Sequence, residues 1–336
     1  MMNENKILHV MILEKFLAPY IDFVDENFGR ENHHYVFITS EKYDYGLTPE
    51  HKVEFLHTDD DIFITLLDYM KMAKKIILHG LWRDKVDMLL YFNQKLLKKC
   101  YWIMWGGDFY FPEKQTWFRH KVIKNIGYLV NGTTGDYELV KKCYGSRGKH
   151  IKCFNYPSNL YKAYKTESNK NNIINIQLGN SATETNHHME ILDSLSKYRD
   201  KNIQIFAPLS YGDKVYAKKV EIYGQKIFGD KFIALTEFMP FEKYLKFLSQ
   251  IDIAIFNHRR QQAFGNIISL VGMGKKVYLN SESTLNGLMA EYRLKVFDTM
   301  NISLNLLDEQ IKNNNITITK EIFSKEKLIN SLKQYL

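Results

Sequence analysis

The chain has 336 residues, of which 45% are hydrophobic and 25% charged, a composition typical of a folded globular protein with room for two domains. Its apolar runs are of strand length, which predicts no membrane-spanning helix, and its three cysteines argue against a disulfide framework. The net charge of +8 is uneven, because residues 71–152 hold 17 Lys and Arg against 6 Asp and Glu, whereas residues 1–70 hold 5 against 14.

The first half of the chain alternates short apolar strands with segments of helical spacing. This alternation predicts a parallel sheet with helices on both faces, and residues 1–154 are assigned to one Rossmann-like domain. The expected strands are 6–13, 35–38, 53–56, 75–78, 101–105 and 128–130, and the expected helices are 16–28, 60–72, 85–97, 115–125 and one that starts at 131–134.

A polar stretch at residues 155–172 interrupts the alternation and is predicted to be an interdomain linker. A second domain, residues 173–318, then repeats the pattern, and residues 319–336 are predicted to form a helix that crosses back to the first domain. The fold class is therefore α/β, with two doubly wound domains facing a central cleft. The expected strands are 173–178, 203–206, 232–235, 251–256, 276–279 and 295–297, and the expected helices are 184–197, 214–227, 241–249, 267–273, 284–292 and 320–336.

A polar loop follows the strand at 251–256 and opens an apolar helix. It offers cationic and amide side chains at a helix start, where backbone N–H groups have no helical partner, and such a place suits a diphosphate. The alternative is an exposed basic loop, which is less favoured because the helix that follows is apolar and hence buried. The residues predicted here to bind the diphosphate of a nucleotide-sugar donor are Arg260, Gln261, Gln262, Gly265 and Asn266.

Two other strand ends of the second domain carry candidates for donor binding. Glycine permits close backbone approach, and short polar side chains hold a phosphate or a sugar hydroxyl, or simply cap the next helix. A tyrosine after the next strand either stacks on a base or sugar or packs as part of a turn. These candidates are Gly179, Asn180, Ser181, Asn186, His188 and Tyr211.

In the first domain, two residues that follow strands are candidates for the general base. Asp108 lies in the segment Trp105-Gly-Gly-Asp-Phe-Tyr, and His79 precedes Gly80. A carboxylate or imidazole at such a place can take the proton of an acceptor hydroxyl. Alternatively, Asp108 caps the next turn and His79 is a structural histidine. Asp108 is the first choice for the catalytic role and His79 the second.

Other site classes lack their motifs. The sequence contains no P-loop, no dinucleotide-binding glycine motif after a strand, no nucleophile elbow and no Asp-x-Asp metal motif, so neither a metal nor a cofactor is expected. The basic segment 71–152 also contains aromatic residues. It is either a set of solvated helix faces or a patch for an anionic membrane surface. Nucleic acid ranks last because no nucleic-acid-binding motif accompanies the charge, and none is expected as a partner.

Together these motifs resemble the TDP-N-acetylfucosamine:lipid II N-acetylfucosaminyltransferases, which form glycosyltransferase family 56. Each piece is short, and their common order makes the match specific. The matching pieces, in order, are His9-Val10, His79-Gly80, Trp105 to Tyr110, Tyr156-Pro157, Gly179-Asn-Ser181 with Asn186 and His188, Pro208 with Tyr211, and Arg260-Gln-Gln262 with Gly265.

The resemblance implies a GT-B fold, a nucleotide-sugar donor in the C-terminal domain and a polyprenyl-diphosphate-linked glycan as acceptor, on the side of residues 1–154. It implies a peripheral position on the cytoplasmic face of the inner membrane, which agrees with the missing signal-peptide pattern. The sequence departs from the family around Asn257, His258, Ser210 and Phe264, so the donor sugar stays open and a capsule or O-antigen pathway is an alternative to enterobacterial common antigen. The competing functions are a sugar-nucleotide epimerase or hydrolase, and a non-enzymatic membrane- or polyanion-binding protein.

Overall fold

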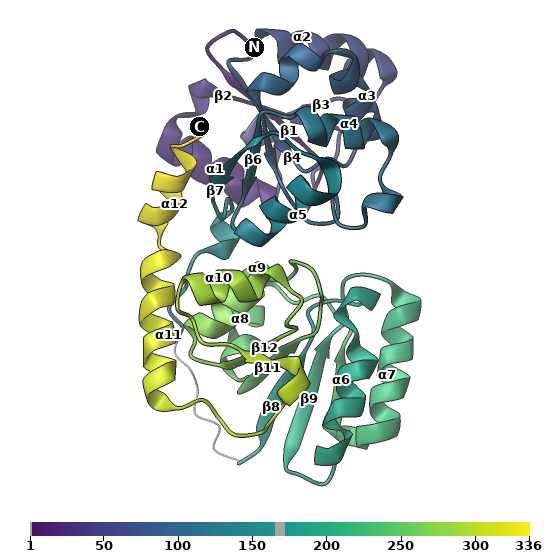
Figure 1. Ribbon diagram of the computed structural model, residues 1–336, viewed down its shortest axis with the longest axis vertical. Coiled ribbons are helices and arrows are strands. Elements are labelled where there is room, and N and C mark those ends of the chain that lie inside the picture. Colours follow the sequence, from purple (N-terminus) through teal and green to yellow (C-terminus); the bar gives the residue numbers. More distant parts are fainter. Residues whose placement is uncertain (1, 165–171) are drawn as a thin grey trace. The chain divides into compact units, whose positions relative to one another are not determined.

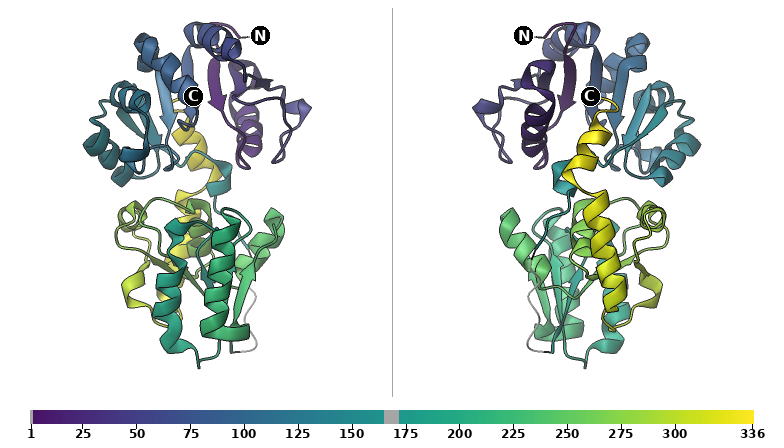
Figure 2. Two further views of the ribbon diagram at one scale, coloured as in Figure 1. Left: turned by 90° about the vertical axis from the view of Figure 1, so that its right-hand side faces the viewer. Right: turned by 90° about the vertical axis from the view of Figure 1, so that its left-hand side faces the viewer.

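A computed structural model describes residues 2–164 and 172–336, which form two compact units (Figure 1). The first unit runs from the N-terminus to Ser158 and also contains Lys325–Leu336, and the second unit is Asn159–Ser324. Residues 165–171, in the predicted linker, lie outside the described residues. Each unit has one parallel sheet with helices on both faces, as Figure 2 shows, which confirms the predicted α/β class.

The first unit contains a seven-stranded parallel sheet in the order β3-β2-β1-β4-β5-β6-β7. The chain builds the sheet outward from β1 in one direction and then returns to place β4 on the other side of β1. This reversal makes a topological switch point between the carboxyl ends of β1 and β4, where ligands of such sheets bind. The strands are β1 (Ile7–Met11), β2 (His33–Phe37), β3 (Glu54–Phe55), β4 (Lys75–His79), β5 (Cys100–Ile103), β6 (Tyr128–Asn131) and β7 (Lys149–Lys152).

Helices of the first unit bury their apolar faces on this sheet. Thr116 and Thr133 cap two of them, since their hydroxyls accept the backbone N–H groups of Arg119 and Asp136. The helices are α1 (Leu17–Phe28), α2 (Leu67–Met72), α3 (Asp84–Phe92), α4 (Trp117–Asn125), α5 (Thr134–Tyr144) and α12 (Lys325–Leu332), and a π-helical segment, Asp61–Leu66, leads into α2.

The second unit contains a six-stranded parallel sheet in the order β10-β9-β8-β11-β12-β13. Its switch point lies between β8 and β11, because the chain moves from β8 to β9 and β10 and then returns to β11. Every residue of β11 and β12 is buried, which is typical of parallel strands covered on both faces. The strands are β8 (Ile174–Leu178), β9 (Ile203–Pro208), β10 (Phe232–Leu235), β11 (Ile253–Phe256), β12 (Lys276–Leu279) and β13 (Phe297–Asp298).

The helices of the second unit lie on both faces of this sheet. Helices α6 and α7 share one apolar core with β8, β9 and β11, whereas α11 packs on α9. The helices are α6 (His188–Leu195), α7 (Lys214–Phe228), α8 (Phe241–Ser249), α9 (Phe264–Gly272), α10 (Thr284–Glu291) and α11 (Glu309–Ile322).

The structure departs from the expected elements in several places. The helix expected at 320–336 is interrupted, because α11 ends at Ile322 and α12 begins separately at Lys325. The helix expected at 85–97 ends at Phe92 and gives way to a 3₁₀ segment, Gln94–Lys99. Strand β7 was not expected, since its Lys-His-Ile-Lys sequence lacks the apolar run of the other strands.

Candidate functional site

In the second unit, Gln262 joins two loops across the switch point of the sheet. Its Nε2 atom donates to Oδ1 of Asn180 at 3.0 Å and lies 3.3 Å from Oγ1 of Thr183. Its Oε1 atom accepts from the hydroxyl of Thr185 at 2.9 Å. The loop after β11 and the loop after β8 therefore form one polar surface at the place where doubly wound sheets bind ligands.

The loop after β8 is held in shape by Asn186, which is fully buried. Its Nδ2 atom donates to the backbone oxygen of Ser181 at 3.0 Å and to Oγ1 of Thr183 at 2.8 Å. Its Oδ1 atom accepts the backbone N–H of Asn180 at 3.3 Å. Asn186 thus sets the position of Asn180, which in turn contacts Gln262.

Gly179 occupies a position that admits no side chain. Its φ is +68°, and a Cβ added there would lie 2.5 Å from Nε2 of His188 and 3.0 Å from Oδ1 of Asn186. His188 is fully buried with Nδ1 3.2 Å from the Tyr216 hydroxyl, and no described residue partners its Nε2. Burial lowers the pKa of His188 to about 3, so its imidazole is neutral at physiological pH.

The loop after β9 is attached to the loop after β8 through the backbone. Ala182 N–H donates to the carbonyl oxygen of Tyr211 at 2.6 Å, and Asp213 N–H donates to the carbonyl oxygen of Ala182 at 2.8 Å. Gly212, with φ +115°, allows this approach, because a Cβ there would lie 2.5 Å from the Ala182 oxygen. The Tyr211 side chain is 57% exposed and is therefore accessible to a ligand.

Helix α9 begins at this same edge of the sheet. Ala263, which precedes it, has a left-handed φ of 58° and turns the chain into the helix. The backbone N–H of Ile267 donates to the Ala263 oxygen at 3.0 Å, so Phe264, Gly265 and Asn266 belong to the first turn, whose N–H groups point out of the helix end. Such an end attracts anions.

The loop after β11 also carries two arginines, which differ in burial, and a hydrogen bond from His258 holds its backbone. His258 donates from Nδ1 to the carbonyl oxygen of Arg260 at 2.9 Å, and burial lowers the pKa of His258 to about 4. Arg260 and Gln261 are half-buried. Arg259 is exposed and forms long ion pairs of 3.7–3.8 Å with two exposed glutamates.

In the first unit, Asp108 is fully buried and connects the ends of β4 and β5. Its Oδ2 atom accepts the backbone N–H of Leu81 at 3.1 Å and the indole N–H of Trp102 at 2.7 Å, and its Oδ1 atom accepts the backbone N–H of Trp105 at 3.1 Å. Burial raises the pKa of Asp108, and the N–H donors oppose that rise. Asp108 therefore has the geometry of a clamp between two loops, and its role as a base stays a prediction.

His79 lies within a buried row of hydrogen-bonded side chains. Its Nδ1 atom is 3.0 Å from the hydroxyl of Tyr156, which also accepts the indole N–H of Trp105 at 2.7 Å. Its Nε2 atom is 3.2 Å from Nδ1 of His9, whose Nε2 is 2.9 Å from Nδ1 of His33. Burial lowers the pKa of His79 to about 3, so the imidazole is neutral, and its catalytic role also stays a prediction.

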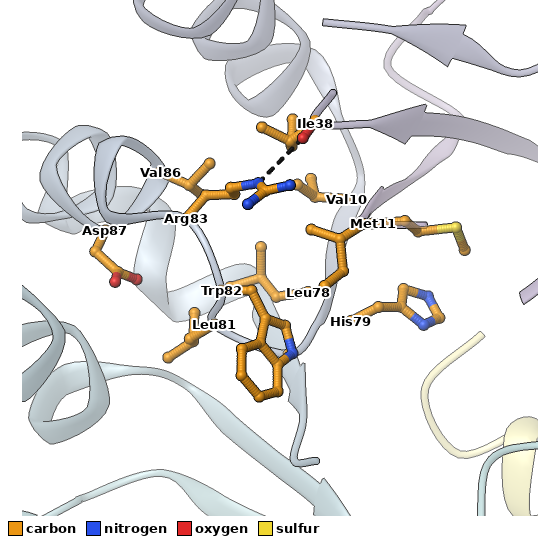
Figure 3. Close-up of a pocket in the computed structure, with 12 residues that line it drawn as sticks. Val10, Met11, Ile38, Leu78, His79, Leu81, Trp82, Arg83, Val86 and Asp87 are labelled. Carbon is orange, nitrogen blue, oxygen red and sulfur yellow. Dashed lines mark hydrogen bonds between the residues drawn. The ribbon is translucent and has the colours of Figure 1, made fainter. Parts of the chain in front are cut away.

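A small pocket lies at the switch point between β1 and β4 (Figure 3). Trp82 covers one side of it and rests on two glycines, since a Cβ added to Gly80 or Gly107 would come within 2.5 Å of the indole. Arg83, at the start of α3, points across the pocket and donates from Nε to the carbonyl oxygen of Ile38 at 3.1 Å (Figure 3). This bond orients the guanidinium, whose two terminal nitrogens have no hydrogen-bond partner among the described residues.

The predicted donor-binding residues lie on loops and helix starts at one edge of the second sheet, and His79 and Asp108 lie at the corresponding edge of the first. Sequence reasoning missed Arg83, although its place just after the strand-end segment His79 to Trp82 was a usable signal. No three His, Cys, Asp or Glu side chains within residues 2–164 and 172–336 come together as metal ligands. In the same ranges, no helix has the length and hydropathy to cross a bilayer.

The chain matches a family model and several solved structures. The model describes the 4-alpha-L-fucosyltransferases of glycosyl transferase group 56 and matches residues 14–324. HepE from Anabaena, crystallised with UDP and glucose, is 12% identical with a TM-score of 0.72, and 98% of each chain is covered. A glycosyltransferase from Rickettsia africae is also 12% identical, with a TM-score of 0.71 and coverage of 99% of this chain and 98% of that one. These low identities support the GT-B fold alone.

Proposed function

The chain belongs to glycosyltransferase family 56, and we propose that it moves a deoxyamino sugar from a TDP- or UDP-sugar to a polyprenyl-diphosphate-linked glycan during synthesis of a bacterial surface polysaccharide. That the protein is a glycosyltransferase follows from the family, which sets aside the epimerase and hydrolase alternatives. The donor, the acceptor and the pathway are the proposed part.

The donor proposal is supported above all by the hydrogen bonds of Gln262 across the second unit's switch point. They place the loop after β8 beside the loop that carries Arg260 and the start of α9. A guanidinium and helix N–H groups at one edge suit a diphosphate, whose charge grows as it leaves the sugar. Tyr211, on the adjoining loop, would stack on the base or the sugar. The other proposed donor contacts are Gly179, Asn180, Ser181, Asn186, His188, Gln261, Gly265 and Asn266.

On the acceptor side, the proposal places the glycan at the carboxyl edge of the first unit's sheet. Arg83 would pair with the acceptor diphosphate, because a guanidinium binds phosphate oxygens with two parallel N–H groups. Asp108 and His79 are the proposed catalytic residues, as base or by holding the loops that meet the acceptor hydroxyl. A lipid-linked acceptor places the enzyme at the cytoplasmic face of the inner membrane, as a peripheral protein.

The donor site is tested by nucleotide-induced thermal shifts with TDP, UDP, GDP and their sugars, followed by kinetics of Arg260→Ala. Loss of a charge-assisted contact to a phosphate costs about 1.5–3 kcal/mol, which is roughly a 10- to 150-fold loss of kcat/KM. Arg259→Ala is the matched control, because its exposed ion pairs contribute about 0–1 kcal/mol. Equal effects of the two substitutions, or unchanged donor affinity in Arg260→Ala, would refute the assigned phosphate site.

A further inference from the structure

The packed pair of helices α3 and α4 in the first unit carries an exposed aromatic cluster. The Tyr91 ring lies 4.8 Å from the ring of Trp117 and 5.4 Å from that of Phe118, and the rings of Phe92 and Phe118 lie 6.1 Å apart. Phe92 is 71% exposed and Trp117 is 55% exposed. Large rings grouped in this way on a surface mark a place where another body binds.

The same two helices and the segments next to them in sequence are rich in cations. Residues 84–99 and 111–125 hold eight Lys and Arg against three Asp and Glu. Two of those acids, Asp84 and Asp87, are hydrogen-bonded to Arg119. Lys121 lies over the Trp117 ring at 5.2 Å. In these segments Lys85, Lys95, Lys98 and Lys114 are exposed, whereas Lys99, Lys121 and Lys124 are half-buried, and Lys85 forms an ion pair with Asp59.

The combination fits a lipid surface better than a protein partner. Lysine is depleted from protein–protein interfaces, whereas lysine and tryptophan are both enriched where a protein meets the headgroups of a bilayer. Aromatic rings with a polar atom, such as those of Tyr91 and Trp117, suit a boundary that is apolar on one side and wet on the other. The excess of cations selects lipids of negative charge.

We propose that the face of the first unit formed by α3 and α4 docks on an anionic bilayer, with Phe92 and Trp117 entering the headgroup layer and the lysines contacting lipid phosphates. We call this surface the α3–α4 face. The proposed function requires contact with a membrane because its acceptor is lipid-linked, and the docking proposal rests on that function. Helix α3 also connects this face with the small pocket between β1 and β4, where the proposed function places the acceptor diphosphate. Arg83 precedes its first residue and Phe92 is its last, about 12 Å further along the axis.

The test measures binding of the full chain to vesicles of phosphatidylglycerol and phosphatidylethanolamine, with phosphatidylcholine vesicles for comparison. The wild type is expected to bind the anionic vesicles, less so as salt rises. Lys95→Glu, Lys98→Glu and Lys114→Glu together should weaken binding at least about tenfold, since each cation near such a surface contributes on the order of 1 kcal/mol. Phe92→Ser with Trp117→Ser should also weaken binding strongly, because the two most exposed rings of the cluster are then lost.

Matched controls come from α7 of the second unit. Val215 and Ile222 are 67% and 57% exposed there, so Val215→Ser with Ile222→Ser removes two exposed apolar side chains from another helix. Lys214→Glu, Lys219→Glu and Lys226→Glu reverse three exposed charges on the same helix. Both controls should bind vesicles like the wild type.

Nucleotide-induced thermal shifts on the same variants keep the two proposals distinguishable. They should stay at the wild-type value, because no substitution on the α3–α4 face touches the donor site. Absence of a shift in the wild type would count against the donor proposal alone. The docking proposal is overturned if the wild type does not bind anionic vesicles, or if the α3–α4 variants bind as well as the α7 controls. It is also overturned if Phe92→Ser with Trp117→Ser only turns a dimer into a monomer.

Discussion

Replacing Asp108 with asparagine distinguishes two roles of this residue, holding two loops together and acting as a catalytic base. The carboxylate accepts only N–H donors, from Leu81, Trp102 and Trp105. In the least costly orientation of Asp108→Asn, the new NH₂ group faces the backbone N–H of Trp105. One hydrogen bond is lost and two buried donors then oppose each other, which costs about 1–3 kcal/mol. For a unit of this size, that lowers Tm by roughly 2–12 °C.

The assay is thermal unfolding, followed by circular dichroism, alongside kcat at a temperature where both proteins are folded. Asp213→Asn is the control, since Asp213 caps α7 through the N–H of Tyr216 at 2.7 Å and asparagine caps a helix equally well. An unchanged Tm in Asp108→Asn together with a large loss of kcat would refute the clamp and support a base. A lowered Tm with a modest change in kcat would support the clamp.

Gly179→Ala should destabilise the second unit by more than about 1 kcal/mol and weaken donor binding, because the methyl group adds a clash with His188 to the cost of a positive φ. Gly145→Ala, where φ is +63° and no atom lies within 4 Å, isolates the backbone cost, and equal losses measured by denaturant unfolding would contradict the clash. Acid should destabilise the first unit, because His79 binds a proton at pH 6.5 when unfolded but only near pH 3 when folded, so the unfolded state gains protons as pH falls. Its contribution to the loss of unfolding free energy is about 2 kcal/mol at pH 5, and a profile that is flat from pH 7 to 5 would show that the imidazole is not held neutral. Arg83→Ala should raise KM for a diphosphate-linked acceptor roughly tenfold and leave nucleotide thermal shifts unchanged, and a loss of donor affinity would place Arg83 elsewhere in the reaction.

The sequence predicts most strands of both sheets because the central strands are continuous apolar runs, such as residues 253–256, bounded by polar turns. Strand β7 escapes this rule, since Lys149–Lys152 lies at the sheet edge and buries little. The break between α11 and α12 also escapes it, because no proline or glycine separates Ile322 from Lys325 and helical spacing continues across the join.

For the candidate site, strand-end position predicts which segments carry polar groups but not which atoms they meet. Gln262 and Asn180 are 82 residues apart, and only the adjacency of β8 and β11 brings them to 3.0 Å. Asp108 and His79 are predicted from the sequence as titratable groups that follow strands, and this pattern does not predict whether a side chain is buried. Their hydrogen-bond partners come from several separate strands and loops, so the sequence alone does not reveal that both side chains are enclosed.

The row of side chains around His79 has a direction. An indole N–H can only donate, so Trp105 makes the Tyr156 oxygen an acceptor and leaves the phenolic proton for His79, the other partner of that hydroxyl among the described residues. His79 then carries its own proton on Nε2 and donates it to Nδ1 of His9. In the same way, His9 donates from Nε2 to Nδ1 of His33. All three imidazoles therefore share one tautomer, and their dipoles align from the β5 loop into the interior. No single ring can reverse its proton without the others, so the orientation of Trp105 at the sheet edge is coupled to a histidine that is not in contact with it.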